Sequence, residues 1–229
     1  MLPGLRTPFL LADGAGAMGP QYIATETIVQ TPNAAYSYSK TFGSAAQPGD
    51  IAIIACLQST TNLFLGYQSI SSGWTQLYEL WGFDDGDTIT RWRYWYRVLQ
   101  TQSETFTISN GGSSSTLRVS CEATVLRIYE DSVVQWVAGD IASNSSSYQT
   151  AAFTKNANAK AYLCCISEYG SSGSYNPPAP NGFTRVRSRT TRNNAQFLAP
   201  AEAVTGAALT WTGLNTTTYE PSVQLFEVI

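Results

Sequence analysis

The sequence predicts an all-β fold in the form of a single jelly-roll-like β-sandwich. The first reason is composition: only 13% of the 229 residues are charged, while 12% are aromatic. Such a composition suits strands, because aromatic and β-branched side chains fit a pleated surface. The second reason is spacing: strand-like stretches recur roughly every eight to twelve residues between turn-forming residues, and no helical period persists.

Strand-like stretches follow one another from Tyr22 to the last residue. The run IAIIACL, residues 51–57, is continuously apolar, which predicts a central strand buried on both faces. The stretches 73–81 and 91–99 flank FDDGDT, whose Asp-Gly step is a hairpin signal. The other strand-like stretches are 22–30, 35–42, 104–109, 117–129, 158–168, 182–186, 207–212 and 222–229.

The second part of the chain repeats the first in a more degenerate form. GDIAIIACLQS is echoed by NAKAYLCCISE, and GWTQL by GFTRV. Cys56 and Cys165 are 109 residues apart, and so are Trp74 and Phe183, which predicts that these two aromatics occupy matching core positions. We expect one sandwich domain, residues 21–229, with related halves at about 47–130 and 156–229.

The polar stretch GDIASNSSS, residues 139–147, separates these repeats. It is either a linker between two domains or a connection inside one domain. We favour one domain, because each half contains long apolar runs that it could not cover by itself.

Residues 1–20 are expected to form an extended N-terminal arm. They are rich in Pro, Gly and Ala, and their one strong apolar triplet is Phe9-Leu10-Leu11. They show no clean signal-sequence pattern, and no stretch of the chain approaches the length of a membrane span. The triplet could bind another subunit, as extended segments do; the alternative is an idle, disordered tail.

Composition also narrows the classes of function. The chain contains no histidine, which removes His-based triads and most transition-metal sites. Its net charge is −3, with ten arginines and three lysines, so no nucleic-acid partner is expected. A hydrolase that uses carboxylates alone is the remaining enzyme alternative. We predict no catalytic residues, no cofactor and no metal.

The four cysteines lie in apolar, strand-like runs and form no C-x-x-C motif. They are Cys56, Cys121, Cys164 and Cys165. A cysteine in such a run usually behaves as a small hydrophobic residue. We expect buried, reduced thiols and assembly in a reducing cytoplasm, with disulfides as the alternative.

The ordered set of strand sequences resembles a duplicated β-sandwich module of bacteriophage virion proteins and some bacterial surface proteins. The set is GDIAIIACL, SSGWTQL, YWYRVL, SETFTIS and ATVLRIY, followed by AKAYLCCIS, PNGFTRV and VQLFEVI. The resemblance covers about residues 47–229 and implies a jelly-roll-like sandwich with a structural or adhesive role. It supplies no catalytic residues.

The stretch RWRYWYRVL, residues 91–99, is the first candidate interface. Side chains alternate along a strand, so Trp92, Tyr94, Tyr96 and Val98 form a core face. The opposite face carries Arg91, Arg93, Trp95, Arg97 and Leu99. We consider three roles for this arginine face: a solvated strand surface, an interface to another subunit, or a platform for a glycan or nucleic acid.

A second arginine group lies at Arg185, Arg187 and Arg189, which alternation places on one strand face, with Val186 pointing inward. It is either an interface or a charged edge that prevents unwanted strand pairing. Tyr175 lies in a Pro-rich loop, residues 169–182, which is either a contact loop or a simple connection.

Together these features predict a non-enzymatic phage virion structural protein. It would be a capsid decoration or cement protein, or a tail or fibre accessory subunit. We expect a homo-oligomer that binds other capsid or tail proteins, is assembled in the host cytoplasm and resides in the virion, with no membrane contact. The alternative is an adhesin module that binds a receptor or host-surface glycan.

Overall fold

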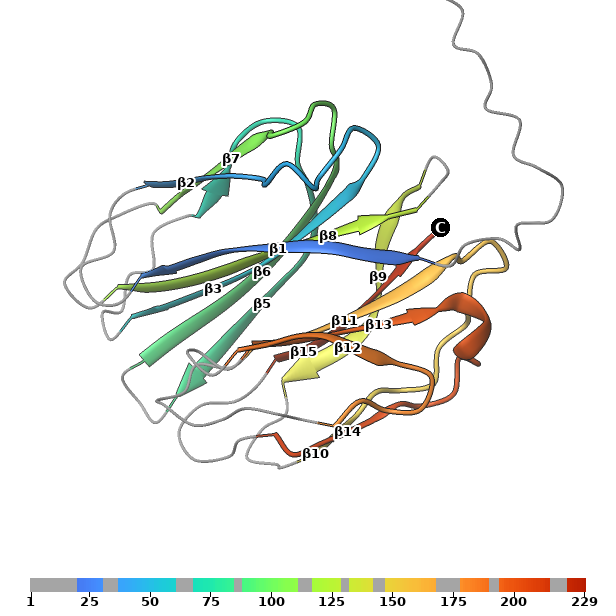
Figure 1. Ribbon diagram of the computed structural model, residues 1–229. Helices are drawn as coiled ribbons and strands as arrows, with labels where there is room; N and C mark the ends of the chain where they lie inside the picture. The colour runs from blue at the N-terminus through green and yellow to red at the C-terminus, as the bar shows by residue number, and fades with distance from the viewer. Residues whose placement is uncertain are drawn as a thin grey trace, which may run out of the picture.

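The computed structural model describes residues 20–30, 37–60, 68–84, 88–110, 117–128, 132–141, 147–167, 178–189, 194–214 and 222–229. Within them the chain is all-β, as predicted, and the one helical segment is a 3₁₀ turn at Ala201–Ala203. Figure 1 shows the strands stacked as layers. Of the expected arm, residues 1–19 lie outside the described residues.

The first half of the chain supplies two sheets. Its strands are β1 (Gln21–Gln30), β2 (Ser37–Thr41), β3 (Ile51–Thr60), β4 (Ser69–Ile70), β5 (Thr75–Asp84), β6 (Thr88–Val98), β7 (Thr105–Ser109) and β8 (Arg118–Arg127). The large sheet has the order β1-β8-β3-β6-β5, and the small sheet the order β2-β7-β4. The predicted hairpin is confirmed, because β5 pairs antiparallel with β6.

The second half repeats this arrangement. Its strands are β9 (Val134–Ile141), β10 (Ser147–Gln149), β11 (Ala161–Ser167), β12 (Thr184–Arg189), β13 (Asn194–Pro200), β14 (Thr210–Thr212) and β15 (Ser222–Val228). The large sheet has the order β12-β13-β11-β15-β9, and β10 pairs with β14. Of the stretch 139–147, Gly139–Ile141 belong to β9 and Ser147 begins β10, and residues 142–146 lie outside the described residues.

The two large sheets have the same topology when β1, β8, β3, β6 and β5 are matched to β9, β15, β11, β13 and β12. A β-bulge recurs at matching positions: the register shifts between Gln76 and Tyr78 in β5, and between Arg185 and Arg187 in β12. Bulges conserved in this way mark a shared design rather than a defect. The predicted duplication is therefore visible in strand order and in local detail.

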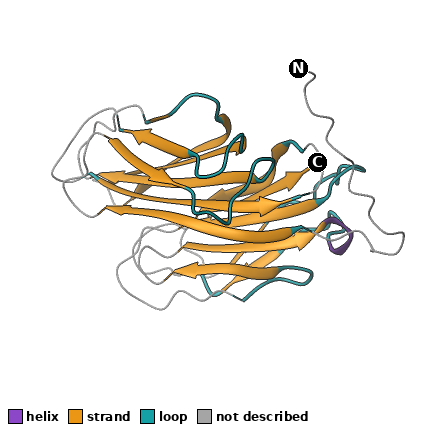
Figure 2. Ribbon diagram, turned by 45° about the horizontal axis from the view of Figure 1, so that its top comes forward, coloured by secondary structure: helices purple, strands orange, loops and turns teal. Residues whose placement is uncertain are grey.

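The large sheets pack face to face, and each small sheet covers the outer face of its own large sheet (Figure 2). Central strand β3 faces β11, and edge strand β5 meets edge strand β9. In the matched strand orders, β5 corresponds to β12 and β9 corresponds to β1. The edge strand at one end of the first sheet therefore meets the edge strand at the other end of the second sheet, which is the arrangement of two halves related by an approximate two-fold rotation. Each half contributes one complete sheet to the central sandwich.

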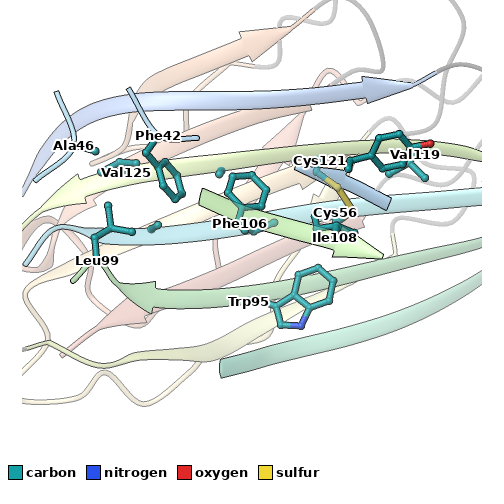
Figure 3. Packing of buried hydrophobic residues seen from close by; sticks show 14 of the residues in the cluster. Phe42, Ala46, Cys56, Trp95, Leu99, Phe106, Ile108, Val119, Cys121 and Val125 are labelled. Atoms are coloured by element: carbon teal, nitrogen blue, oxygen red, sulfur yellow. A yellow bond between two sulfur atoms is a disulfide. The ribbon is translucent and has the colours of Figure 1, made fainter. Parts of the chain in front are cut away.

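Three apolar layers hold these sheets together. The middle layer lies between the large sheets and contains Ile53 of β3, Leu163 of β11 and Phe226 of β15. The outer layers lie under the small sheets; Figure 3 shows Phe42, Phe106 and Trp95 in the first of them. Every residue of β3 is buried, which confirms the prediction from IAIIACL. A strand covered on both faces needs apolar side chains at successive positions.

The aromatic pair of each outer layer is matched across the duplication. Trp74 packs edge-to-face on Phe106 with ring centroids 5.8 Å apart, and Phe183 packs in the same way on Trp211 at 5.4 Å. Tryptophan and phenylalanine thus exchange places. The prediction that Trp74 and Phe183 occupy matching positions is therefore confirmed. Phe183 is buried, as a core residue should be, whereas Trp74 is only half-buried.

The expected match between Cys56 and Cys165 is wrong. Cys56 faces the outer layer, whereas Cys165 lies in the middle layer and occupies the position that corresponds to Ala55. In the first half the turn Gln47–Asp50 is followed directly by β3, which begins at Ile51. In the second half the equivalent turn Asn156–Ala159 is followed by one extra residue, Lys160, before β11 begins. Because a shift of one residue moves every side chain of a strand to the opposite face, the sequence spacing that matched Trp74 with Phe183 mismatched the cysteines.

Cys56 and Cys121 form a disulfide (Figure 3), which corrects the expectation of four reduced thiols. The two residues are direct cross-strand partners in β3 and β8, a pairing that the sequence alone does not reveal. Cys164 and Cys165 are free and buried, as predicted. Burial raises the pKa of both thiols, and the Glu122 carboxylate raises that of Cys165 further, so these thiols remain protonated and unreactive.

Candidate functional site

The predicted core face of β6 is confirmed, but the arginine face is not a surface. Trp92 and Tyr94 lie in the middle layer. On the opposite face Trp95 and Leu99 lie in the outer layer beneath the small sheet, and only 1% of the Arg93 side chain is exposed. The interpretation of Arg91, Arg93 and Trp95 as an external interface is therefore wrong, because both arginines are buried and Trp95 packs beneath β2, β7 and β4.

Glu79 of β5 binds both buried arginines. Its Oε2 accepts a hydrogen bond from Arg93 Nε at 3.1 Å, and its Oε1 pairs with Arg91. Burial alone would raise the pKa of Glu79, but the hydrogen bonds from Arg91 and Arg93 lower it overall. The Arg91 guanidinium also lies 3.9 Å from the ring centroid of Trp81, a cation–π contact. This cluster orders β5 against β6.

The side chain of Arg97, in β6, is held against the turn that precedes β5. Its Nε pairs with Glu104 Oε1 at 2.7 Å, and its Nη1 donates to the Ser72 carbonyl at 2.9 Å. The adjoining Gly73 has a φ of +88°, and a Cβ there would lie 2.6 Å from Arg97 Nη1. A cavity of about 360 Å³ opens beside Arg97, lined by Gly73, Thr75, Tyr96, Arg97, Val98, Gln100 and Ser132.

The second arginine group lies on β12, whose register shifts between Arg185 and Arg187. The bulge between Arg185 and Arg187 interrupts the alternation on which that prediction depended. Arg185 is exposed, and Val186 packs against the middle layer as expected. The side chains of Arg187 and Arg189 lie outside the described residues, as do Tyr175 and the triplet Phe9, Leu10 and Leu11.

Three large hydrophobic side chains of the described residues are exposed, in or next to β5 and β9. They are Trp81, Val133 and Trp136, with exposed fractions of 42%, 55% and 36%. Tyr78 of β5 stacks on Trp136 of β9, with ring centroids 4.6 Å apart and ring planes at 6°. We call the stacked pair Tyr78 and Trp136 the aromatic rim. Trp81 lies on the opposite face of β5, where it pairs with Arg91.

Sequence reasoning missed the aromatic rim. The sequence places Tyr78 in the ordinary strand-like stretch 73–81, and it does not predict β9, the strand of Trp136, as a separate element. The sequence feature that could have pointed to these residues is the high aromatic content of the chain, 12%. Only the packing of two sheets brings β5 and β9 together.

A polar network supports the rim from inside. Trp136 Nε1 donates to Gln224 Oε1 at 2.8 Å, and Gln224 Nε2 donates to Ser222 Oγ at 3.0 Å. Ser222 Oγ lies 3.1 Å from the Tyr94 hydroxyl of the opposite sheet. Buried polar groups joined in this way fix side-chain orientations, so Trp136 is held in one position although it is partly exposed.

In the part of the chain that the structure describes, no three His, Cys, Asp or Glu side chains are grouped to hold a metal ion. No helix of those residues has the length and apolar character needed to cross a membrane. Comparisons with known protein families, with curated proteins and with solved structures gave no match for this chain.

Proposed function

We propose that the chain is a non-enzymatic structural subunit of a bacteriophage virion that acts by binding other copies of itself and neighbouring virion proteins. The role is either capsid decoration or a tail or fibre accessory function. The observation that carries the proposal is the duplicated architecture: the two halves have the same sheet arrangement and pack against each other through their large sheets. Such a rigid, duplicated body suits a load-bearing or spacing role.

The ionic side chains of this body support a structural role. Glu79 binds Arg91 and Arg93, Glu104 binds Arg97, and Asp50 accepts hydrogen bonds from Arg127 Nε and Nη2 at 2.8 and 2.9 Å. These pairs join strands to strands or strands to turns. Charges used in this way orient the framework, whereas an acid–base catalyst needs a titratable group directed at a substrate.

The Cys56–Cys121 disulfide fits a protein whose working place is outside the reducing cytoplasm. Disulfides persist on virion and cell surfaces and are rare in cytosolic proteins. We therefore infer assembly in the host cytoplasm followed by oxidation in the released particle.

Attachment through the segment before β1 is the testable part of this proposal. Substituting Phe9, Leu10 and Leu11 together by alanine in the full chain should abolish incorporation into particles, because burying the three side chains would contribute on the order of 5 kcal/mol before ordering costs. The matched control is Leu2→Ala with Leu5→Ala, which removes apolar side chains from the same segment. Incorporation is measured by quantifying the chain in purified virions.

If the triple variant enters particles as the wild type does, attachment through this segment is wrong. The exposed surfaces of the sandwich, including Arg185, would then be the candidates. If wild-type chain is absent from purified virions, the virion role itself is wrong.

A further inference from the structure

We propose that the cavity beside Arg97 is a binding site for a small organic carboxylate. This inference goes beyond the assembly role and does not depend on it. The cavity has a volume of about 360 Å³, which is within the range of sites that hold small organic ligands. Its lining joins both halves of the chain, because β5 and β6 belong to the first half and Ser132 lies just before the first strand of the second.

Arg97 is fixed in place and still has a free donor. Its Nε pairs with Glu104 at 2.7 Å, and its Nη1 donates to the Ser72 carbonyl at 2.9 Å. Its Nη2 has no hydrogen-bond partner among the described residues, and 23% of the side chain is exposed. A guanidinium group that is already ordered loses little conformational entropy when a ligand binds. Nη2 can therefore donate a charge-assisted hydrogen bond to a carboxylate oxygen while Nε and Nη1 keep their present partners.

Two hydroxyl groups line the same cavity and are available to a ligand. Thr75 and Tyr96 are direct cross-strand partners in β5 and β6. Within the described part of the chain neither hydroxyl takes part in a hydrogen bond, so each can donate to a bound carboxylate. The ring of Tyr96 and the side chain of Val98 add apolar surface for the hydrocarbon part of the ligand. The cavity thus combines a cation, two donors and an apolar wall.

The charges at the cavity favour an anion with a single charge. None of the described residues that line it is acidic, and Arg97 is cationic. Behind the lining, Lys160 Nζ donates to Ser132 Oγ at 3.2 Å, which places a second cation near the cavity. Glu104 offsets part of this positive charge and would repel a dianion such as hydrogen phosphate more strongly than a carboxylate.

The second half of the chain replaces these groups by apolar residues. The strand pairing makes Leu198 and Ala199 the counterparts of Tyr96 and Arg97. Near Gly182 the second half places a backbone carbonyl oxygen of its 3₁₀ turn, 2.7 Å from the position of a Cβ, where the first half places the Arg97 guanidinium. The same sheet is therefore built without an arginine or a tyrosine hydroxyl at these positions, which leaves both groups free to serve binding.

The first experiment titrates the wild-type full chain with carboxylates and with amides of the same shape, observed by saturation-transfer NMR. The probe pairs are lactate with lactamide and benzoate with benzamide, and inorganic phosphate is the dianion. We expect at least one carboxylate to bind with a Kd on the order of 1 mM or below, and its amide to bind at least about tenfold more weakly. No binding of either carboxylate up to about 10 mM, equal binding of the amides, or tighter binding of phosphate overturns the proposal.

The second experiment locates the site with the carboxylate that bound. The double variant Thr75→Val, Tyr96→Phe removes both hydroxyls, and the matched control Thr184→Val makes the same change at the counterpart of Thr75 in the second half. We expect the double variant to bind at least about tenfold more weakly, and the control to bind within about twofold of the wild type. Wild-type affinity of the double variant, or equal loss in the control, overturns the proposal.

Arg97→Gln tests the cation at the same site, with its fold checked by circular dichroism because Arg97 also pairs with Glu104. We expect the folded variant to bind at least about tenfold more weakly, and unchanged affinity overturns the proposal. If this variant does not fold, the double variant decides. Incorporation into virions is measured separately, so failure here leaves the assembly role intact.

Discussion

At the scale of single residues, the cluster around Glu79 shows how the fold accommodates charge in its interior. Arg93 is almost completely buried, and a buried charge is tolerated only when it is paired and hydrogen-bonded. Glu79 supplies such a partner from the neighbouring strand, with about a fifth of its own side chain exposed. One carboxylate thereby positions Arg91 and Arg93, and through Arg91 the ring of Trp81.

We expect Glu79→Gln to lower the free energy of unfolding at pH 7 by about 2 kcal/mol, less than the ~3–5 kcal/mol for breaking a fully buried pair. The pKa of Glu79 is lowered in the folded state, so its contribution is present above the pKa of the unfolded chain and is lost as the pH falls below about 4. Urea unfolding at pH 7 and at pH 3 measures both effects.

The matched control is Glu202→Gln, which makes the same change at an exposed position and should alter stability by less than about 0.5 kcal/mol. A difference between Glu79→Gln and the wild type that is equally large at pH 3 and pH 7 would contradict the ionic explanation.

At the scale of elements, β3 and β8 are joined both by their hydrogen-bond ladder and by the Cys56–Cys121 disulfide. β3 lies at the centre of the first large sheet, and each large sheet ends in edge strands that carry bulges: β1 and β5 in one, β12 and β9 in the other. Bulged edges resist unwanted pairing with other chains. A disulfide thus links the central strand of the first large sheet to its neighbour, and bulges at the two edge strands hinder pairing with other chains.

Reduction of this disulfide should lower the melting temperature. The bond spans 65 residues, and removing a cross-link of this length costs about 2–4 kcal/mol, chiefly by freeing the unfolded chain. Differential scanning calorimetry with and without dithiothreitol measures the effect. The double variant Cys56→Ser, Cys121→Ser is the control and should not respond to the reductant. An unchanged melting temperature of the wild type on full reduction would show that the bond does not stabilise the fold.

At the scale of the whole molecule, the middle apolar layer belongs to neither half alone. Phe226 of the second half packs on Tyr94 of the first, with ring centroids 5.1 Å apart, and Thr124 hydrogen-bonds Gln196 across the same layer. A half without its partner would expose the inner face of its large sheet. Burial of that shared face couples the two halves.

We therefore expect the chain to unfold in one calorimetric transition. Phe226→Ala should lower stability by about 3–5 kcal/mol, as loss of a fully buried aromatic does, and should shift the whole transition to lower temperature. Phe153→Ala, at a half-buried outer position, serves as a milder comparison. Two separate transitions, with only the later strands affected by Phe226→Ala, would show that the halves fold independently.

The sequence by itself determined the fold class, the duplication and the central strand. Aromatic and β-branched content, short strand spacing and the apolar run 51–57 are local properties, and strand formation responds to them directly. The same local information predicted that Trp92 and Tyr94 face a core, and that Cys164 and Cys165 are buried.

Only the tertiary structure decided what lies opposite each strand face. Alternation along β6 separated Arg93 and Trp95 from the core face correctly, but it could not show that a second sheet covers them. One extra residue before β11 reversed the face that sequence spacing had assigned to Cys165, and a bulge in β12 interrupts the alternation that had been assumed there. The disulfide and the aromatic rim likewise join residues far apart in the chain. Such contacts depend on sheet order and register, which are set by the packing of the whole molecule.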